Sequence, residues 1–165
     1  MKKFLFIIFA LTLCLFAISF QKPEVSADTE NKGELISSEI EYFEDGSYLV
    51  TEYYSISKTS NARSNMRIVT HTAVVTEYSA TNKVLWIYEL IGDWFVEDGI
   101  SVQAAASVVN TTINGSGWSF HELEATYAGA KVHGGGNFKF KVLGVVVKTI
   151  NMDINMECDV YGELI

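Results

Sequence analysis

The sequence is poor in proline, cysteine and basic side chains, and each shortage excludes a class of protein. One proline in 165 residues excludes Pro-rich linkers and a collagen-like chain. Twelve lysine and arginine residues against twenty aspartate and glutamate residues give a net charge of −8. That acidic balance leaves little positive charge for phosphates, so we expect no nucleic-acid partner. The apolar content of 48% is too high for a disordered chain, and the length suits one folded domain.

The first 27 residues have the three-part layout of a secretory signal peptide. Lys2 and Lys3 begin it, an apolar stretch of 17 residues follows over Phe4–Phe20, and Val25 and Ala27 flank a cut after Ala27. As a helix that stretch reaches about 25 Å, short of the ~30 Å hydrocarbon core of a bilayer. We therefore predict a signal peptide at residues 1–27 and a secreted protein. The alternative is a membrane anchor formed by an uncleaved N-terminal helix.

Cleavage after Ala27 leaves an exported chain with one cysteine, Cys158, and a net charge of −10, because three of the cations and one of the acids precede the cut. No disulfide can then form within the chain, and its 138 residues are enough to bury a core without one. We expect residues 28–34 to form a flexible acidic leader and residues 35–165 a single β domain. Residues 58–65 are the one internal linker candidate, and they could set a first hairpin, residues 35–57, apart from the main body.

After the leader, apolar and polar side chains alternate with a period of two, which is typical of strands. The clearest run shares one apolar face near the C-terminus: Ile150, Met152, Ile154, Met156, Cys158 and Val160. Because free cysteine packs like a small hydrophobic residue, Cys158 on that face is predicted to be a buried free thiol.

Turn signals every 8–14 residues divide the chain into about eight strands, and no segment has a convincing helical period. Asp45-Gly46 closes the first hairpin, and Leu143-Gly144 closes another near the C-terminus. The apolar face changes parity between Phe120 and Leu123, which predicts a β-bulge. We therefore expect an all-β fold, either an antiparallel β-sandwich or a partly open barrel of about eight strands.

No motif in the sequence assembles a catalytic site. His133-Gly134-Gly135-Gly136 imitates the oxyanion motif of some esterases, but no G-x-S-x-G nucleophile elbow accompanies it. We interpret these glycines as a bulge or a wide loop at the start of a strand. His121-Glu122 opens like a zinc-protease motif, yet its fifth residue is Ala125.

Metal and carboxylate sites are equally weak. The spacing of His71, His121 and His133 predicts no metal site. Asp153, Glu157 and Asp159 follow one strand face. They form a weak cation site, a carboxylate pair of the glycosidase kind or, as we favour, a solvated face balanced by Lys139 and Lys141. We predict no catalytic residue, no metal and no cofactor.

Aromatic residues, 13% of the chain, provide the one hint of a binding site. Tyrosines crowd the acidic first hairpin, and alternation predicts that its more apolar set packs inward. Tyr53 would then lie outside, with Glu39 and Glu41 as polar companions, and we predict these three residues as a ligand-binding site. Trp86 and Trp94 lie on an apolar face and are predicted to be core.

About half of the chain carries short segments that resemble other proteins. They are Lys83-Val84-Leu85-Trp86, the Gly117-Trp118 turn, residues 142–149 (VLGVVVKT) and Cys158-Asp159. In these segments the chain resembles a loose group of small exported β-rich proteins of Gram-positive bacteria, which have no assigned activity. The resemblance implies an exported β domain and carries no function. It also implies a second cysteine near Gln103 or Ala104 that bridges to Cys158, and this sequence lacks that cysteine.

The function we predict is that of an exported, non-enzymatic β-sandwich that binds an extracellular ligand: a glycan, a surface polymer or another protein. The alternative is a secreted membrane-active toxin or bacteriocin-like effector, in which Ser101–Ile113, rich in small residues, unfolds into an amphipathic hairpin. The net charge of −10 disfavours attraction to anionic lipids, so we expect no stable membrane insertion after cleavage.

Overall fold

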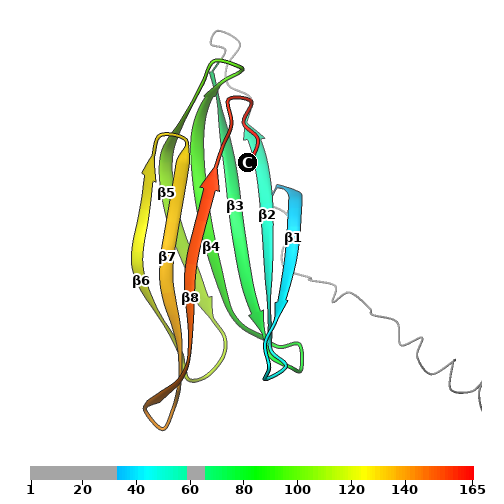
Figure 1. Ribbon diagram of the computed structural model, residues 1–165, viewed down its shortest axis with the longest axis vertical. Helices are drawn as coiled ribbons and strands as arrows, with labels where there is room; N and C mark the ends of the chain where they lie inside the picture. The colour runs from blue at the N-terminus through cyan, green and yellow to red at the C-terminus, as the bar shows by residue number, and fades with distance from the viewer. Residues whose placement is uncertain (1–32, 59–65) are drawn as a thin grey trace, which may run out of the picture.

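The computed structural model of the protein describes residues 33–58 and 66–165, which form eight antiparallel strands (Figure 1). The expected signal peptide, most of the leader and most of the linker candidate lie outside the described residues. The strands are β1 (Glu34–Tyr42), β2 (Tyr48–Lys58), β3 (Met66–Tyr78), β4 (Val84–Glu97), β5 (Ser101–Ile113), β6 (Trp118–Ala128), β7 (Lys131–Val142) and β8 (Val145–Glu157). The all-β antiparallel prediction is confirmed, and Glu34, assigned to the leader, begins β1.

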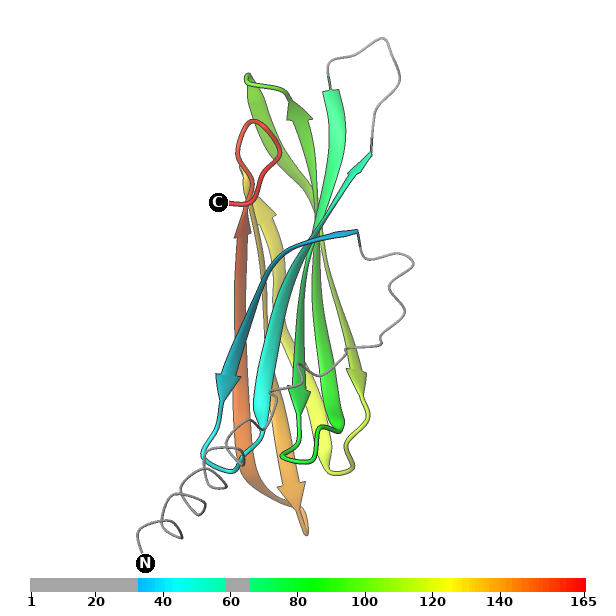
Figure 2. The same cartoon turned by 90° about the vertical axis from the view of Figure 1, so that its right-hand side faces the viewer.

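The strands form two sheets whose order follows the chain, β1-β2-β3-β4-β5 and β6-β7-β8. The smaller sheet covers part of one face of the larger sheet, away from β1, and neither sheet closes on itself (Figures 1 and 2). The first hairpin is not set apart from the main body, because β2 pairs with β3 from Tyr48↔Tyr78 to Lys58↔Ile68. Ser101–Ile113, the segment that the toxin alternative would unfold, is β5 and pairs with β4 along its length.

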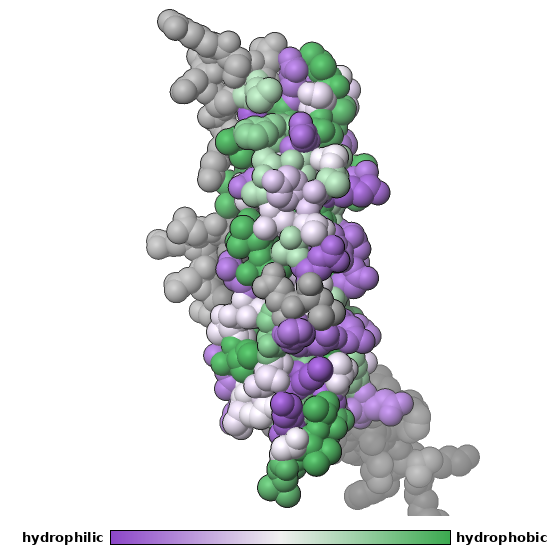
Figure 3. All heavy atoms as spheres, turned by 90° about the vertical axis from the view of Figure 1, so that its left-hand side faces the viewer, coloured by the Kyte–Doolittle hydropathy of each residue, from purple (hydrophilic) through white to green (hydrophobic). Residues whose placement is uncertain are grey.

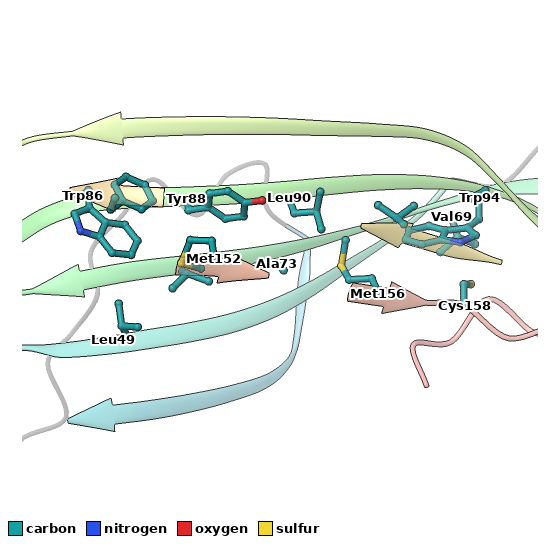
Figure 4. Packing of buried hydrophobic residues seen from close by; sticks show 14 of the residues in the cluster. Leu49, Val69, Ala73, Trp86, Tyr88, Leu90, Trp94, Met152, Met156 and Cys158 are labelled. Atoms are coloured by element: carbon teal, nitrogen blue, oxygen red, sulfur yellow. The ribbon is translucent and has the colours of Figure 1, made fainter. Parts of the chain in front are cut away.

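The main core lies between the sheets, where the alternating apolar faces meet (Figure 4). Trp86 stacks on Phe138 of the other sheet with ring centroids 3.7 Å apart, and Trp94 donates a hydrogen bond from Nε1 to the carbonyl oxygen of Ala130 at 2.8 Å. Both tryptophans are fully buried, which confirms them as core. The core also includes, among others, Val69, Ala73, Val75, Tyr88, Leu90, Val132, Met152, Met156 and Cys158.

The glycine run after His133 lies inside β7, so its interpretation as a loop at the start of a strand was wrong, whereas Gly135 and Gly136 do pair with residues on either side of a bulge in β6. A Cβ atom on Gly134 would lie 2.6 Å from the hydroxyl oxygen of Tyr88, and one on Gly136 would lie 2.4 Å from the ring of Phe120. These glycines are therefore places where the β7 backbone meets aromatic side chains directly. The predicted bulge in β6 is confirmed by a register shift between Glu122 and Glu124.

Candidate ligand-binding site

The predicted site residues share one face of the first hairpin, but that face does not point away from the core. Tyr53 pairs with Ser37, and Glu39 pairs with Thr51, so Tyr53, Glu39 and Glu41 point to the same side. Both glutamates are exposed, whereas Tyr53 is half-buried and packs against the main core. Burial, and after it the negative charge of Glu39, raises the pKa of the Tyr53 hydroxyl. The prediction that Tyr53 lies outside was therefore wrong.

The error came from the opposite face of β2, which is also buried. Tyr48, Val50 and Tyr78 form a second apolar cluster there, in which the rings of Tyr48 and Tyr78 stack 5.0 Å apart. Tyr53 instead lines a cavity of about 220 Å³ together with Ile36, Met156 and Leu164. The two glutamates are not among its lining residues.

A larger cavity of about 410 Å³ lies toward the opposite end of the sheets, and we call it the Lys148 cavity. Its floor lies between the two sheets, and each sheet contributes side chains from neighbouring strands. Trp118, Phe140 and Lys148 are successive neighbours across the smaller sheet, and Glu77 is the neighbour of Trp86 in the larger one. The turns contribute Asp45, Ser47, Ser79 and Ser116 to the rim.

Lys148 holds this cavity together. Its Nζ atom donates hydrogen bonds to Glu77 Oε1 at 2.8 Å, Ser47 Oγ at 2.9 Å and Asp45 Oδ2 at 3.1 Å. The same ammonium lies 4.3 Å from the ring centroid of Phe43, within the range of a cation–π contact. One cation thus joins the smaller sheet to the β1–β2 turn and to the end of β3.

The two carboxylates around Lys148 differ in environment. Hydrogen bonds from Ser47, aided by Lys148, lower the pKa of Asp45 to about 2. Burial raises the pKa of Glu77, while the hydrogen bond and charge of Lys148 oppose that rise. Glu77 is fully buried, and its Oε2 atom has no hydrogen-bond partner among the described residues. The indole N–H of Trp86 lies near enough to lower the pKa of Glu77, but its geometry falls short of a hydrogen bond.

The wall of the cavity is aromatic. The rings of Trp118 and Phe140 lie 5.4 Å apart, and Trp118 meets the buried Trp86 edge to face at 6.2 Å. Of the three tryptophans, Trp118 alone is half-buried rather than fully buried. The Lys148 cavity therefore combines a partly exposed aromatic surface, an ammonium, two carboxylates and several hydroxyl groups.

Sequence reasoning missed this cavity, although a signal for it was present. Glu77 continues the inward face that Val75 shares in β3, and Lys148 continues the inward face that Ile150 shares in β8. Two opposite charges that interrupt apolar faces of separate strands predict a buried ion pair, because an unpaired buried charge is too costly.

The other candidate groups lie apart from the Lys148 cavity. His133 contacts Asp153 at 3.1 Å and Glu124 at 3.9 Å on the outer face of the smaller sheet. Glu157 pairs with Lys131 at 3.0 Å, not with Lys139 or Lys141 as the solvated-face interpretation proposed. Within residues 33–58 and 66–165, no three His, Cys, Asp or Glu side chains gather as metal ligands.

The predicted buried thiol is confirmed. Cys158 is 1% exposed, and burial raises its pKa to about 12, so the sulfur stays protonated. Its Sγ atom lies 3.9 Å from Nε2 of the buried His71, which also contacts the carbonyl oxygen of Gly162 at 3.0 Å. The His71–Cys158 pair is therefore a packed part of the core at the end that the C-terminal residues cover.

These features define an all-β protein of two packed antiparallel sheets with a polar, aromatic-walled cavity at one end. Comparisons with protein-family models, with curated proteins and with solved structures find no match to this chain. The resemblance to exported proteins of Gram-positive bacteria therefore stays a prediction. Among the described residues, no helix has the length and apolar character needed to cross a membrane.

Proposed function

We propose that the protein is an exported, non-enzymatic β-sandwich that binds an extracellular glycan in the Lys148 cavity. The observation that carries this proposal is the half-buried ring of Trp118, which forms a wall of a cavity of about 410 Å³ that the Lys148 ammonium and the Asp45 carboxylate also line. A ring with charged groups beside it can contact both the apolar face and the hydroxyl groups of one ligand.

The rest of the cavity supports a sugar in preference to a purely apolar ligand. Ligand sites combine apolar walls with a few placed polar groups, typically in 300–1,000 Å³, and a cavity of about 410 Å³ lies within that range. The ring of Trp118 offers a flat surface for the C–H face of a sugar, while Asp45 and Ser116 offer polar atoms at the rim. A surface polymer with repeating sugar units fits the same chemistry.

The arrangement around Lys148 favours binding over catalysis. Asp45 and Glu77 both bond to one ammonium, which holds each in a fixed ion pair. An ion pair with an ammonium makes a carboxylate a weaker base and a weaker nucleophile than a free one, and Glu77 is fully buried, so a substrate cannot reach it. We therefore propose no reaction for this site.

A glycan array probed with the chain and with two variants tests the proposal. Trp118→Ala should abolish binding to the glycans that the unaltered chain retains, because it removes the wall of the cavity. Tyr127→Ala, which removes an exposed ring from the same strand, is the matched control and should bind normally. Equal binding by all three folded proteins, or no glycan retained by the unaltered chain, would contradict the proposal.

Export is tested separately. If the signal peptide is cleaved as proposed, N-terminal sequencing of protein from the culture medium should begin at Asp28. Recovery of the chain with Met1 from a membrane fraction would exclude that cleavage.

A further inference from the structure

The hairpin between β7 and β8 ends in an exposed apolar segment, residues 142–147, which we call the apolar tip. Leu143 is 100% exposed, Val145 65% and Val147 58%, and Val142 and Val146 are nearly half exposed. The tip extends beyond the other turns at that end of the elongated molecule, and its hydrophobic surface is visible at the bottom of Figure 3 (Figures 1 and 3). Contiguous apolar residues at such a projecting end mark an interaction site.

Folding does not account for the leucine at this position. Leu143 has φ +51° and Gly144 φ +83°, the two positive angles of a turn that prefers Asn-Gly or Asp-Gly. A leucine is disfavoured at positive φ, and full exposure leaves Leu143 no core contact to offset that cost. Leu143 therefore has an unfavourable backbone conformation that no packing contact offsets, and such a residue points to a role in binding.

Two lysines that form no ion pair with the described residues lie on β7 just before the apolar tip, although the whole chain is acidic. Residues 137–151 contain three lysines and no acid. Among the described residues, neither Lys139 nor Lys141 has a carboxylate within ion-pairing distance. The third, Lys148, pairs with both Asp45 and Glu77 and so adds no free positive charge. The charge of Lys139 and Lys141 complements anionic headgroups next to an apolar layer.

The acidic part of the smaller sheet is too distant to cancel that attraction. Asp153 follows Leu143 by ten residues, about 33 Å along an extended strand, and charges are largely screened beyond about 8 Å at physiological salt.

We propose that the apolar tip docks into the interfacial layer of an anionic lipid bilayer, with Leu143 and its valines among the acyl chains and Lys139 and Lys141 at the headgroups. Docking is peripheral, and the strands stay folded in their two sheets. The proposal is independent of glycan binding, because the apolar tip does not line the Lys148 cavity.

The test uses the full chain with a tryptophan reporter, so that membrane contact by other segments does not enter the readout. Val146→Trp places the reporter on the apolar tip, and Ile100→Trp places a matched, exposed reporter in the β4–β5 turn. Each chain is mixed with vesicles of equimolar phosphatidylcholine and phosphatidylglycerol, with and without brominated acyl chains. Quenching is measured relative to the chain without the reporter.

Bromine should quench the reporter at residue 146 strongly and the reporter at residue 100 little. Adding Leu143→Asn to the Val146→Trp chain should weaken vesicle binding of the tip at least tenfold, while thermal stability stays equal or rises, because asparagine suits the turn. Phosphatidylcholine alone should give less quenching. Equal quenching of both reporters, or no loss with Leu143→Asn, would overturn the proposal. A vesicle-free dimer that Leu143→Asn dissociates would assign the apolar tip to a second copy instead.

Discussion

Lys148 and Glu77 show how much one pair of side chains contributes to this protein. Both continue the apolar face of a strand, and they meet at 2.8 Å from opposite sheets. Desolvation makes each charge costly by itself, so either side chain alone would oppose folding. The pair therefore joins the sheets at the end where the candidate site lies.

Lys148→Met should destabilise the fold by about 3 kcal/mol, the lower end of the range for a broken buried pair, since the Lys148 side chain is 24% exposed. The change leaves Glu77 buried without its cation. Urea unfolding at pH 7 measures the loss. The double variant Lys148→Met, Glu77→Leu should recover most of it, and a double variant as unstable as the single one would disprove this explanation.

Cys158 should resist modification in the native state. Burial holds the pKa of its thiol at about 12, so peptide mapping after thiol labelling should find Cys158 modified only in denaturant. Cys158→Ser should cost about 1–3 kcal/mol, because it buries a hydroxyl at an apolar site. Rapid labelling of Cys158 in folded protein would place the thiol outside the core.

His71 predicts a loss of stability in weak acid. Burial is the main cause that lowers its pKa in the folded state, whereas the unfolded chain binds a proton near pH 6.5. The stabilising contribution of neutral His71 is thus complete above that pH and lost as the pH falls below it. Unfolding free energies at pH 7 and pH 5 should differ less in His71→Gln than in the unaltered chain. An equal pH dependence in both would assign the effect to other groups.

At the scale of elements, the alternation of apolar and polar residues predicted where the strands lie, but it predicted less well which face of each strand is buried. The C-terminal hairpin and the bulge in β6 followed from period and parity, since one face of each strand is clearly apolar. The same reasoning failed for β2 because both of its faces are covered: Tyr53 packs against the main core, and Tyr48 and Val50 of the opposite face belong to the second apolar cluster. A pattern within one strand cannot specify which of two covered faces meets the other sheet.

The glycines of β7 allow a test of whether close packing between the two sheets requires glycine at these positions. Gly134→Ala should destabilise the protein by about 1–3 kcal/mol, because its Cβ would meet Tyr88 and Leu90 at under 3 Å. Gly135→Ala is the matched control, since its Cβ would meet nothing closer than 3.4 Å. Melting temperatures of the two variants measure the difference, and a similar loss in both would show that backbone freedom, not close approach, requires these glycines.

The half-buried Tyr53 leads to a corrected expectation for the first hairpin. Tyr53→Ala should lower the melting temperature, because the ring packs against the main core. Glu39→Ala, a change on the same face at an exposed position, should leave it nearly unchanged. A melting temperature unaltered by Tyr53→Ala would return this residue to the surface.

For the whole molecule, the two cavities lie where they do because the two sheets have unequal numbers of strands. Five strands face three, so the packed core stays closed in the middle while cavities remain near the margins. The sequence could not predict these margins, because they depend on how the sheets are offset. The Lys148 cavity and the apolar tip lie toward the same end of the molecule, and the buried His71–Cys158 pair lies toward the other.

The most direct measurement of glycan binding is a fluorescence titration of the chain with neutral, amino and acidic oligosaccharides. Since Trp86 and Trp94 are fully buried and Trp118 is half-buried, a ligand in the Lys148 cavity should contact Trp118 and change its emission. We predict a saturable change with at least one oligosaccharide, abolished in Trp118→Phe and weakened in Glu77→Gln. An emission change that persists in Trp118→Phe, or no saturable change with any oligosaccharide, would contradict glycan binding in this cavity.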